Sequence, residues 1–141
     1  MTNSILLCRT SATLACLAMA AAASPLFAAD RMSTGEWEFT VTMDGESHSS
    51  KRCVTAEEAN GLNGDATSVR NYAEEKSSGR CSIKSYDVAA KTISYSMICG
   101  DRQVDSVTEY AKGSTKATVT TTHGGHSITS KVAGRRLGKC K

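Results

Sequence analysis

The fold follows from one stretch near the start of the chain, Gly35-Glu36-Trp37-Glu38-Phe39-Thr40-Val41-Thr42-Met43. Large apolar and polar side chains alternate along it, and alternate side chains of a strand point to opposite faces. The apolar residues from Trp37 to Met43 therefore share one face, and the glutamates and threonines share the other. We expect a half-buried strand with Trp37 as a core anchor.

The chain turns back after this strand at Asp44-Gly45, and the polar run 47–54 returns beside it. The turn length decides the faces, because a one-residue slip exchanges them. A two-residue loop sets Arg52 opposite Trp37, whereas a three-residue loop over 44–46 sets Cys53 there. We expect the three-residue loop.

Thr55 and Glu58 form a capping box, which predicts a short helix over residues 56–60 that stops at Gly61. Residues 63–79 have no clean period, and we expect a loop there, although Val69 and Tyr72 could share one side of a second helical turn.

Beyond Cys81 the sequence reads as a series of strands separated by short turns. The expected strands are 81–88, 92–99, 104–110, 116–122 and 127–133. Consecutive strands with such short turns pair as antiparallel neighbours. The predicted fold is mainly β: a single twisted antiparallel meander sheet of about six to seven strands, with one short helix and two disulfides. Partial closure of the sheet into a barrel is an open alternative.

The N-terminus has the layout of a cleavable signal peptide. Arg9 precedes an apolar run over 12–23, and small residues surround Ala28 and Ala29. The run is shorter than the roughly 20 apolar residues that a membrane span needs. We therefore expect residues 1–28 to be a signal peptide and residues 29–141 to be a single exported, periplasmic β domain. A lipoprotein anchored at Cys16 is the disfavoured alternative.

Four cysteines remain in the mature chain, Cys53, Cys81, Cys99 and Cys140, and an oxidising compartment favours their pairing. A loop over 89–91 pairs Val88 with Thr92 and, counted outward, Cys81 with Cys99. Cys53 would then join Cys140. Four cysteines allow three connectivities, and we favour this one.

Several of these motifs together resemble domain-of-unknown-function family 3617, small exported proteins of Gram-negative bacteria. The motifs are Gly35-Glu36-Trp37-Glu38, Cys53-Val54-Thr55 with Glu57-Glu58, the hairpin between Cys81 and Cys99, and Gly134-Arg135-Arg136-Leu137-Gly138-Lys139-Cys140. The resemblance implies a periplasmic, mostly β domain. It brings no established activity and no functional residue.

Three histidines are the candidate metal ligands: His123 and His126, which flank a glycine turn, and His48. Two ligands on a flexible turn make an incomplete zinc or copper site, so we expect no metal and no other cofactor. Glu36 and Glu38 could be cast as an acid/base pair, but their alternation with Trp37 is typical of a solvated strand face.

The bulk charge of the mature domain selects no partner, because without Arg9 the 17 Lys and Arg of the chain become 16, against 14 Asp and Glu. The last residues are locally basic and could attract lipid headgroups or a polysaccharide, although a solvated terminal strand is the simpler interpretation. The basic residues are Lys131, Arg135, Arg136, Lys139 and Lys141. Nucleic acid is disfavoured by the compartment.

The function that these features favour is a non-catalytic binding or envelope-associated module. Its partner would be a protein, a small molecule or an envelope component, and its binding residues are unknown. We expect a monomer with no membrane span in the mature chain and no catalytic residue. The alternatives are a secreted inhibitor of an enzyme such as a lysozyme or protease, and a periplasmic metal-binding protein using the His-Gly-Gly-His turn.

The signal-peptide interpretation predicts that the exported protein begins at Ala29 or Asp30, because the small residues at this point suit signal peptidase. Intact mass of the protein recovered from the periplasm measures the start directly. A retained N-terminus, or a lipid on Cys16, would contradict it.

Overall fold

The computed structural model describes residues 29–141, so the expected signal peptide lies outside the described residues. Nine elements follow one another within these residues. They are β1 (Gly35–Met43), β2 (Glu46–Val54), α1 (Ala56–Asn63), α2 (Ala66–Ser77), β3 (Cys81–Val88), β4 (Thr92–Cys99), β5 (Arg102–Ala111), β6 (Ser114–His123) and β7 (His126–Gly138).

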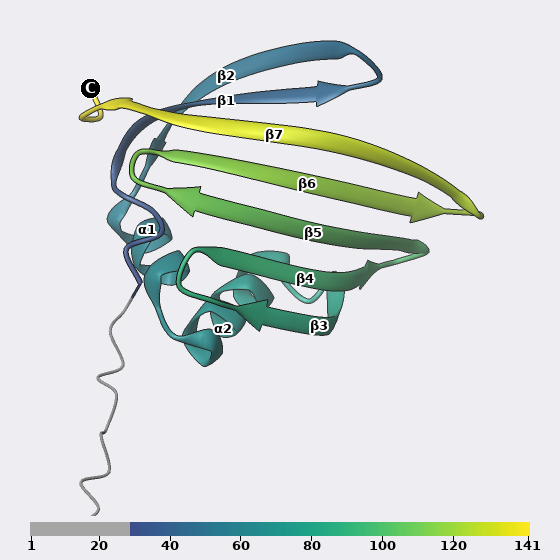
Figure 1. The fold of residues 1–141 in the computed structure, drawn as a ribbon. Coiled ribbons are helices and arrows are strands. Elements are labelled where there is room, and N and C mark those ends of the chain that lie inside the picture. The colour runs from purple at the N-terminus through teal and green to yellow at the C-terminus, as the bar shows by residue number, and fades with distance from the viewer. Residues whose placement is uncertain (1–28) are drawn as a thin grey trace, which may run out of the picture.

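All seven strands form one antiparallel sheet in the order β2-β1-β7-β6-β5-β4-β3 (Figure 1). The last strand returns to pair with the first, so strands far apart in the sequence meet in the middle of the sheet. The mainly β prediction is confirmed. The sheet is open, with β2 and β3 at its edges, so the alternative of a partly closed barrel is wrong.

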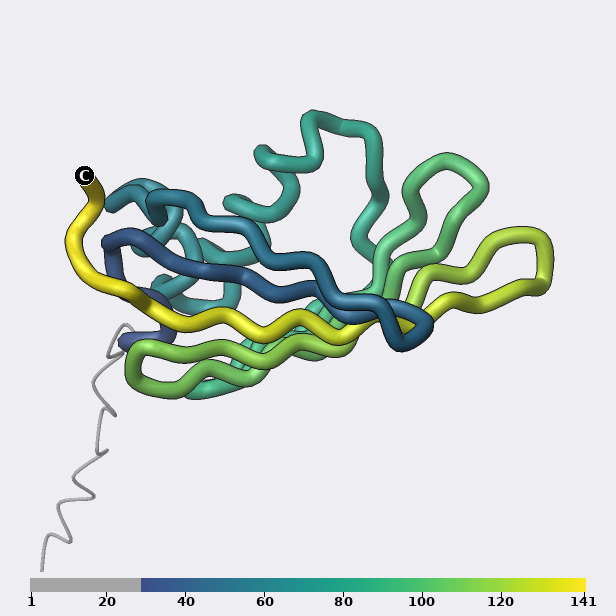
Figure 2. Tube along the Cα trace, turned by 90° about the horizontal axis from the view of Figure 1, so that it is seen from above, coloured from purple at the N-terminus to yellow at the C-terminus, as the bar shows by residue number. Residues whose placement is uncertain are grey.

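Both helices lie on the same side of the sheet, near one end of the strands (Figure 2). The expectation of one helix is therefore wrong, because α2 occupies the stretch expected to be a loop. Asp65 caps α2 by accepting a hydrogen bond from the Ser68 amide at 2.8 Å. Val69 is its one fully buried side chain. Because α2 buries only this one side chain fully, its sequence shows almost no stripe of apolar residues at helical spacing.

The first helix begins as expected, with the Thr55 hydroxyl accepting from the Glu58 amide, but it runs past Gly61 to Asn63. Gly61 of α1 packs against α2, since a Cβ at this position would collide with the ring of Tyr72. Gly61 is therefore a packing residue, and the expected helix end there is wrong.

The hairpin between β1 and β2 has a two-residue turn, and it sets Trp37 opposite Arg52. The expected three-residue loop is wrong. Asp44 and Gly45 both have positive φ, 51° and 85°, as a type I′ turn requires, and that turn matches the twist of paired strands. Arg52 consequently shares the face of Trp37, while Cys53 points to the other face.

The structure joins Cys53 to Cys140 and Cys81 to Cys99, which is the favoured pairing. The expected register of this hairpin is wrong at its turn, because Val88 pairs with Ile93 and not with Thr92. A β-bulge between Ile83 and Ser85 restores the register, and Cys81 then faces Cys99.

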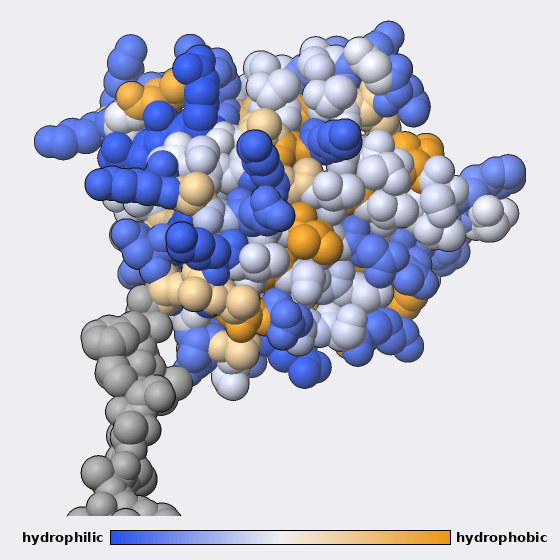
Figure 3. Space-filling view, viewed as in Figure 1, coloured by the Kyte–Doolittle hydropathy of each residue, from blue (hydrophilic) through white to orange (hydrophobic). Residues whose placement is uncertain are grey.

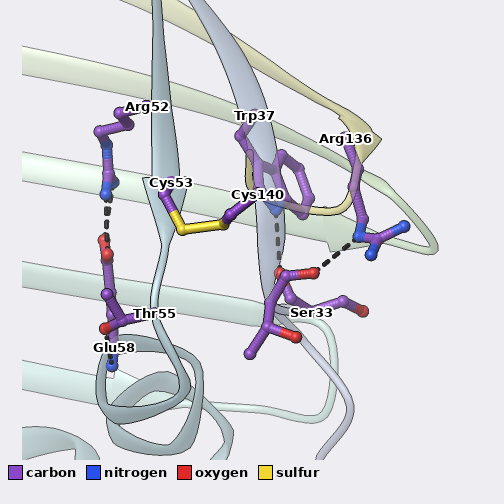
Figure 4. Close-up of a disulfide and its surroundings, with 9 residues drawn as sticks. Ser33, Trp37, Arg52, Cys53, Thr55, Glu58, Arg136 and Cys140 are labelled. Carbon is purple, nitrogen blue, oxygen red and sulfur yellow. Dashed lines mark hydrogen bonds and ion pairs between the residues drawn. A yellow bond between two sulfur atoms is a disulfide. The ribbon is translucent and has the colours of Figure 1, made fainter.

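The core consists of two apolar clusters under the helices. Met32, Trp37, Val54 and Ala59 form one, and Val69, Ile93 and Tyr110 form the other. Leu62 of α1 packs against both. Trp37 is fully buried, and its indole N–H donates to the Ser33 carbonyl at 2.9 Å (Figure 4). Its expected role as a core anchor is confirmed.

Arg31 is the second anchor: it is buried, and within residues 29–141 it forms no ion pair with a carboxylate. Its guanidinium donates to the carbonyls of Leu62, Gly64 and Ala89 at 2.6, 3.0 and 2.9 Å. The Asn63 side chain accepts from the amides of Arg31 and Met32, both at 2.8 Å, and donates to the Met32 carbonyl at 2.7 Å. The segment before β1 is thus tied to the helices and to the β3–β4 turn.

We predict that Arg31→Met lowers the free energy of unfolding by about 2–4 kcal/mol, because three partly buried carbonyls lose a charged donor. Chemical denaturation measures the loss. Arg70→Met is the matched control: Arg70 is exposed and pairs with Glu74 one helical turn away, a contact worth at most about 0.5 kcal/mol. Equal losses in the two variants would contradict this role of Arg31.

Burial raises the pKa of both Tyr86 and Tyr110 to about 12. The folded protein therefore retains phenol protons that the unfolded chain releases near pH 10, so stability should fall as the pH rises from about 10 to about 12. Melting temperature against pH measures this fall. The double variant Tyr86→Phe, Tyr110→Phe should flatten it, and an equally steep fall in that variant would contradict the assignment.

Candidate functional site

The face of the sheet opposite the helices is rich in side-chain hydroxyls, and we call it the hydroxyl face. Strand register assigns alternate residues of each strand to this face. The Ser and Thr residues on it are Thr40, Thr42, Ser47, Ser49, Ser82, Ser85, Thr92, Ser94, Ser96, Ser114, Thr118, Thr120, Thr122, Ser127 and Thr129. Figure 3 views the sheet from this side, where pale side chains cover much of the surface between blue charged groups.

Many of the hydroxyls are bonded in pairs across neighbouring strands. Thr40 and Thr42 contact Ser49 and Ser47, each at 2.8 Å. Similar pairs join β6 to β7, with Thr122 bonded to Ser127 at 2.8 Å and Thr120 to Thr129 at 3.1 Å. The bonds hold the side chains in fixed positions, so this face presents an ordered polar surface.

A shallow hollow of about 360 Å³ lies in the middle of the hydroxyl face. Thr42, Lys131, Thr118 and Val107 are successive neighbours across β1, β7, β6 and β5, and the adjacent row is Thr40, Ala133, Lys116 and Glu109. The small side chain of Ala133 leaves space between its larger neighbours. Val107 contributes an apolar wall and is 49% exposed.

The hollow carries two ammonium groups, those of Lys116 and Lys131, and one carboxylate, that of Glu109 opposite Lys116, so its formal charge is positive. Within residues 29–141, neither Lys116 nor Lys131 forms an ion pair, whereas the nearby Arg135 is held by Glu38 at 2.7 Å. Both lysines are exposed. Two cations beside threonine hydroxyls can hold a carboxylate or phosphate together with hydroxyl groups of the same ligand.

The structure divides the basic C-terminal residues between different surfaces. Lys131 and Arg135 lie on the hydroxyl face, while Arg136 lies on the face of Trp37 and donates to the Thr34 carbonyl at 2.8 Å (Figure 4). Lys139 and Lys141 follow the end of β7. The local basic run is therefore not one patch, and Lys131 is the member that lines the hollow.

The three histidines do not come together. His123 and His126 pair across the Gly124-Gly125 turn, and His123 Nδ1 lies 3.2 Å from the Asp101 carboxylate. His48 lies on the edge strand β2, opposite Val41. Among the described residues, no three His, Cys, Asp or Glu side chains gather in a way that could hold a metal ion.

The glutamates considered as an acid/base pair belong to the hydroxyl face. Glu38 accepts from Arg135 Nε at 2.8 Å, and Glu36 lies opposite Cys53. Their placement is that of a solvated strand face, as expected. The hollow itself was not predicted from the sequence. The alternation of threonines in β6 places Lys116 on the same face as Thr118. Their neighbours on β5 and β7 depend on the register of strand pairing, which this alternation does not determine.

The opposite face is covered by the helices at one end only. Beyond them it leaves three large apolar side chains partly exposed: Val41 at 40%, Met43 at 45% and Ile128 at 52%. This area is a second exposed surface. No helix in the part of the chain that the structure describes is long and apolar enough to cross a membrane.

Fold and surface define a small β-sheet domain that is cross-linked by two disulfides and has one polar sheet face open to solvent. Residues 32–140 match the family described as protein of unknown function (DUF3617), and the chain belongs to that family. The resemblance found in the sequence motifs is thereby confirmed. No curated protein and no solved structure matches the chain.

Proposed function

We propose that this protein is an exported, non-catalytic binding domain that holds an anionic, hydroxyl-bearing ligand in the hollow of the hydroxyl face. The observation that carries the proposal is the placement of Lys116 and Lys131 beside threonines of β1 and β6, on a surface open to solvent. An acidic saccharide of the cell envelope has this chemistry, and so does a phosphorylated lipid headgroup.

Export is part of the proposal and rests on two features. The segment 1–28 has the order of regions of a signal peptide, and both disulfides suit an oxidising compartment. The inhibitor alternative has less support, because the turns between β3 and β7 contain only two or three residues and offer no long loop to a partner's active site.

The affinity of one such hollow should be modest. Exposed ion pairs contribute about 0.2–1 kcal/mol each, and a shallow surface removes little apolar area from water. Much of the binding would depend on charge, so raising the salt concentration should weaken it.

The test is titration of the folded protein with a short oligogalacturonate, followed by NMR chemical shifts or calorimetry. We predict binding that weakens with salt and a Kd about tenfold higher for Lys116→Gln, Lys131→Gln, since two ion pairs are lost. The matched control is Lys51→Gln, Lys112→Gln: Lys51 lies on the same face but outside the hollow, and Lys112 lies in a turn.

Two further arms separate the ligand sources. Vesicles containing phosphatidylglycerol replace the saccharide in one arm, with phosphatidylcholine vesicles as the neutral comparison. A neutral oligosaccharide of equal length is used in the other. Equal binding of charged and neutral probes, or unchanged binding by the hollow variant, would overturn the proposal.

A further inference from the structure

The two edges of the sheet differ in how well they are protected. The β3 edge is interrupted by the bulge between Ile83 and Ser85, and α2 contacts this strand. The β2 edge pairs with β1 over nine consecutive residues without a bulge, contains no proline, and is exposed from Glu46 to Cys53. In Figure 1 nothing lies beyond β2. A long regular edge of this kind is a template for another strand.

The turn of the hairpin determines which backbone groups of β2 are free. In a two-residue hairpin, the residues that flank the turn, here Met43 and Glu46, form a hydrogen-bonded pair, and such pairs alternate along the ladder. The even-numbered residues of β2 therefore bond to β1. Ser47, Ser49 and Lys51 direct their N–H and C=O groups outward, where a further strand can pair with them.

A second copy of β2 fits this edge in one register better than in its neighbours. With Ser49 opposite Ser49 across a two-fold axis, Ser47 pairs with Lys51 and Glu46 pairs with Arg52, so two pairs of opposite charge form. A shift of two residues in either direction removes both of these opposite-charge pairs. One shift sets His48 opposite His48 of the second copy, and the other sets His48 opposite Arg52. Serines at the centre allow close approach of the two strands.

Arg52 has the capacity for a second carboxylate. Its Nη1 and Nη2 contact the two oxygens of Glu58 on α1, each at 2.7 Å, and its guanidinium lies 4.7 Å above the ring of Phe39. Figure 4 shows this side chain aligned with Glu58. Its Nε and the remaining N–H groups are still available as donors. Glu58 and Phe39 thus hold Arg52 in place before a partner arrives.

We propose that two copies of this chain associate through β2, antiparallel and centred on Ser49, so that their sheets become continuous. The monomer expected from the sequence would then be the dissociated form. A two-fold axis perpendicular to the sheet turns both hydroxyl faces to the same side. With strands about 4.8 Å apart, five spacings separate the two β7 strands, each of which lines a hollow, so these two strands would lie about 24 Å apart.

Sedimentation velocity over a range of protein concentrations tests the association. The wild type should dimerise. Ser49→Pro should shift the dimerisation constant at least tenfold toward monomer, because it removes an N–H that points away from β1 and would bond to the second copy. Glu46→Lys should do the same by setting like charges opposite Arg52. Glu75→Lys, the same charge change on α2, is the matched control and should dimerise like the wild type.

Cross-linking tests the register independently. Ser49→Cys should form an intermolecular disulfide under mild oxidation, with peptide mapping to verify that Cys53 to Cys140 and Cys81 to Cys99 are intact. Ser47→Cys should not, since its two copies would be about 14 Å apart, beyond the reach of a disulfide. A monomeric wild type at every concentration, a dimer indifferent to both Ser49→Pro and Glu46→Lys, or equal cross-linking at the two positions would overturn the proposal.

Discussion

The buried guanidinium of Arg31 holds together three parts of the chain that the sequence keeps far apart. It donates to carbonyls at the end of α1, in the connection to α2 and in the β3–β4 turn. Asn63 binds the backbone on either side of Met32 in the same region. Because partly buried carbonyls that lose a donor are costly, these bonds favour the position that the helices take over the sheet.

That position leaves most of the sheet uncovered, and the rest of the molecule follows from it. The two apolar clusters lie where the helices are, joined by Leu62. The face away from the helices has no layer to pack against, so it is built from threonines, serines and charged residues that water solvates. The proposed binding surface belongs to this face, on four strands of the interior of the sheet, where ladders on both sides restrict motion.

The order of the strands also explains why β2 has a free edge. Antiparallel strands added in sequence order would place β1 at an edge, but β7 returns to pair with it, and its hairpin partner β2 becomes the outermost strand. Cys53 is bonded to Cys140 just beyond the end of β7, which fastens this return. The bridge joins β2 to the C-terminus and leaves the outer side of β2 accessible.

Much of the architecture was predictable from local patterns. The alternation in 35–43 defined a half-buried strand around Trp37, the capping box started α1 at the right residue, and the spacing of turns after Cys81 located five strands. These features depend on neighbours in sequence, whose side-chain directions follow from backbone geometry alone. Local patterns fail for α2, because a helix that buries a single side chain fully has too weak an apolar period to distinguish it from a loop.

The pairing register of the strands could not be predicted from local sequence patterns. The choice between a two-residue and a three-residue turn at Asp44 exchanges the faces of β2, and the bulge beside Lys84 corrects an offset that counting from the turn cannot reveal. By itself, the sequence determined the β class, the cysteines available for pairing and the motifs of the family. Only the tertiary structure decided that Lys116 and Lys131 meet around Ala133 and that β2 is free, because both depend on which distant strands become neighbours in the sheet.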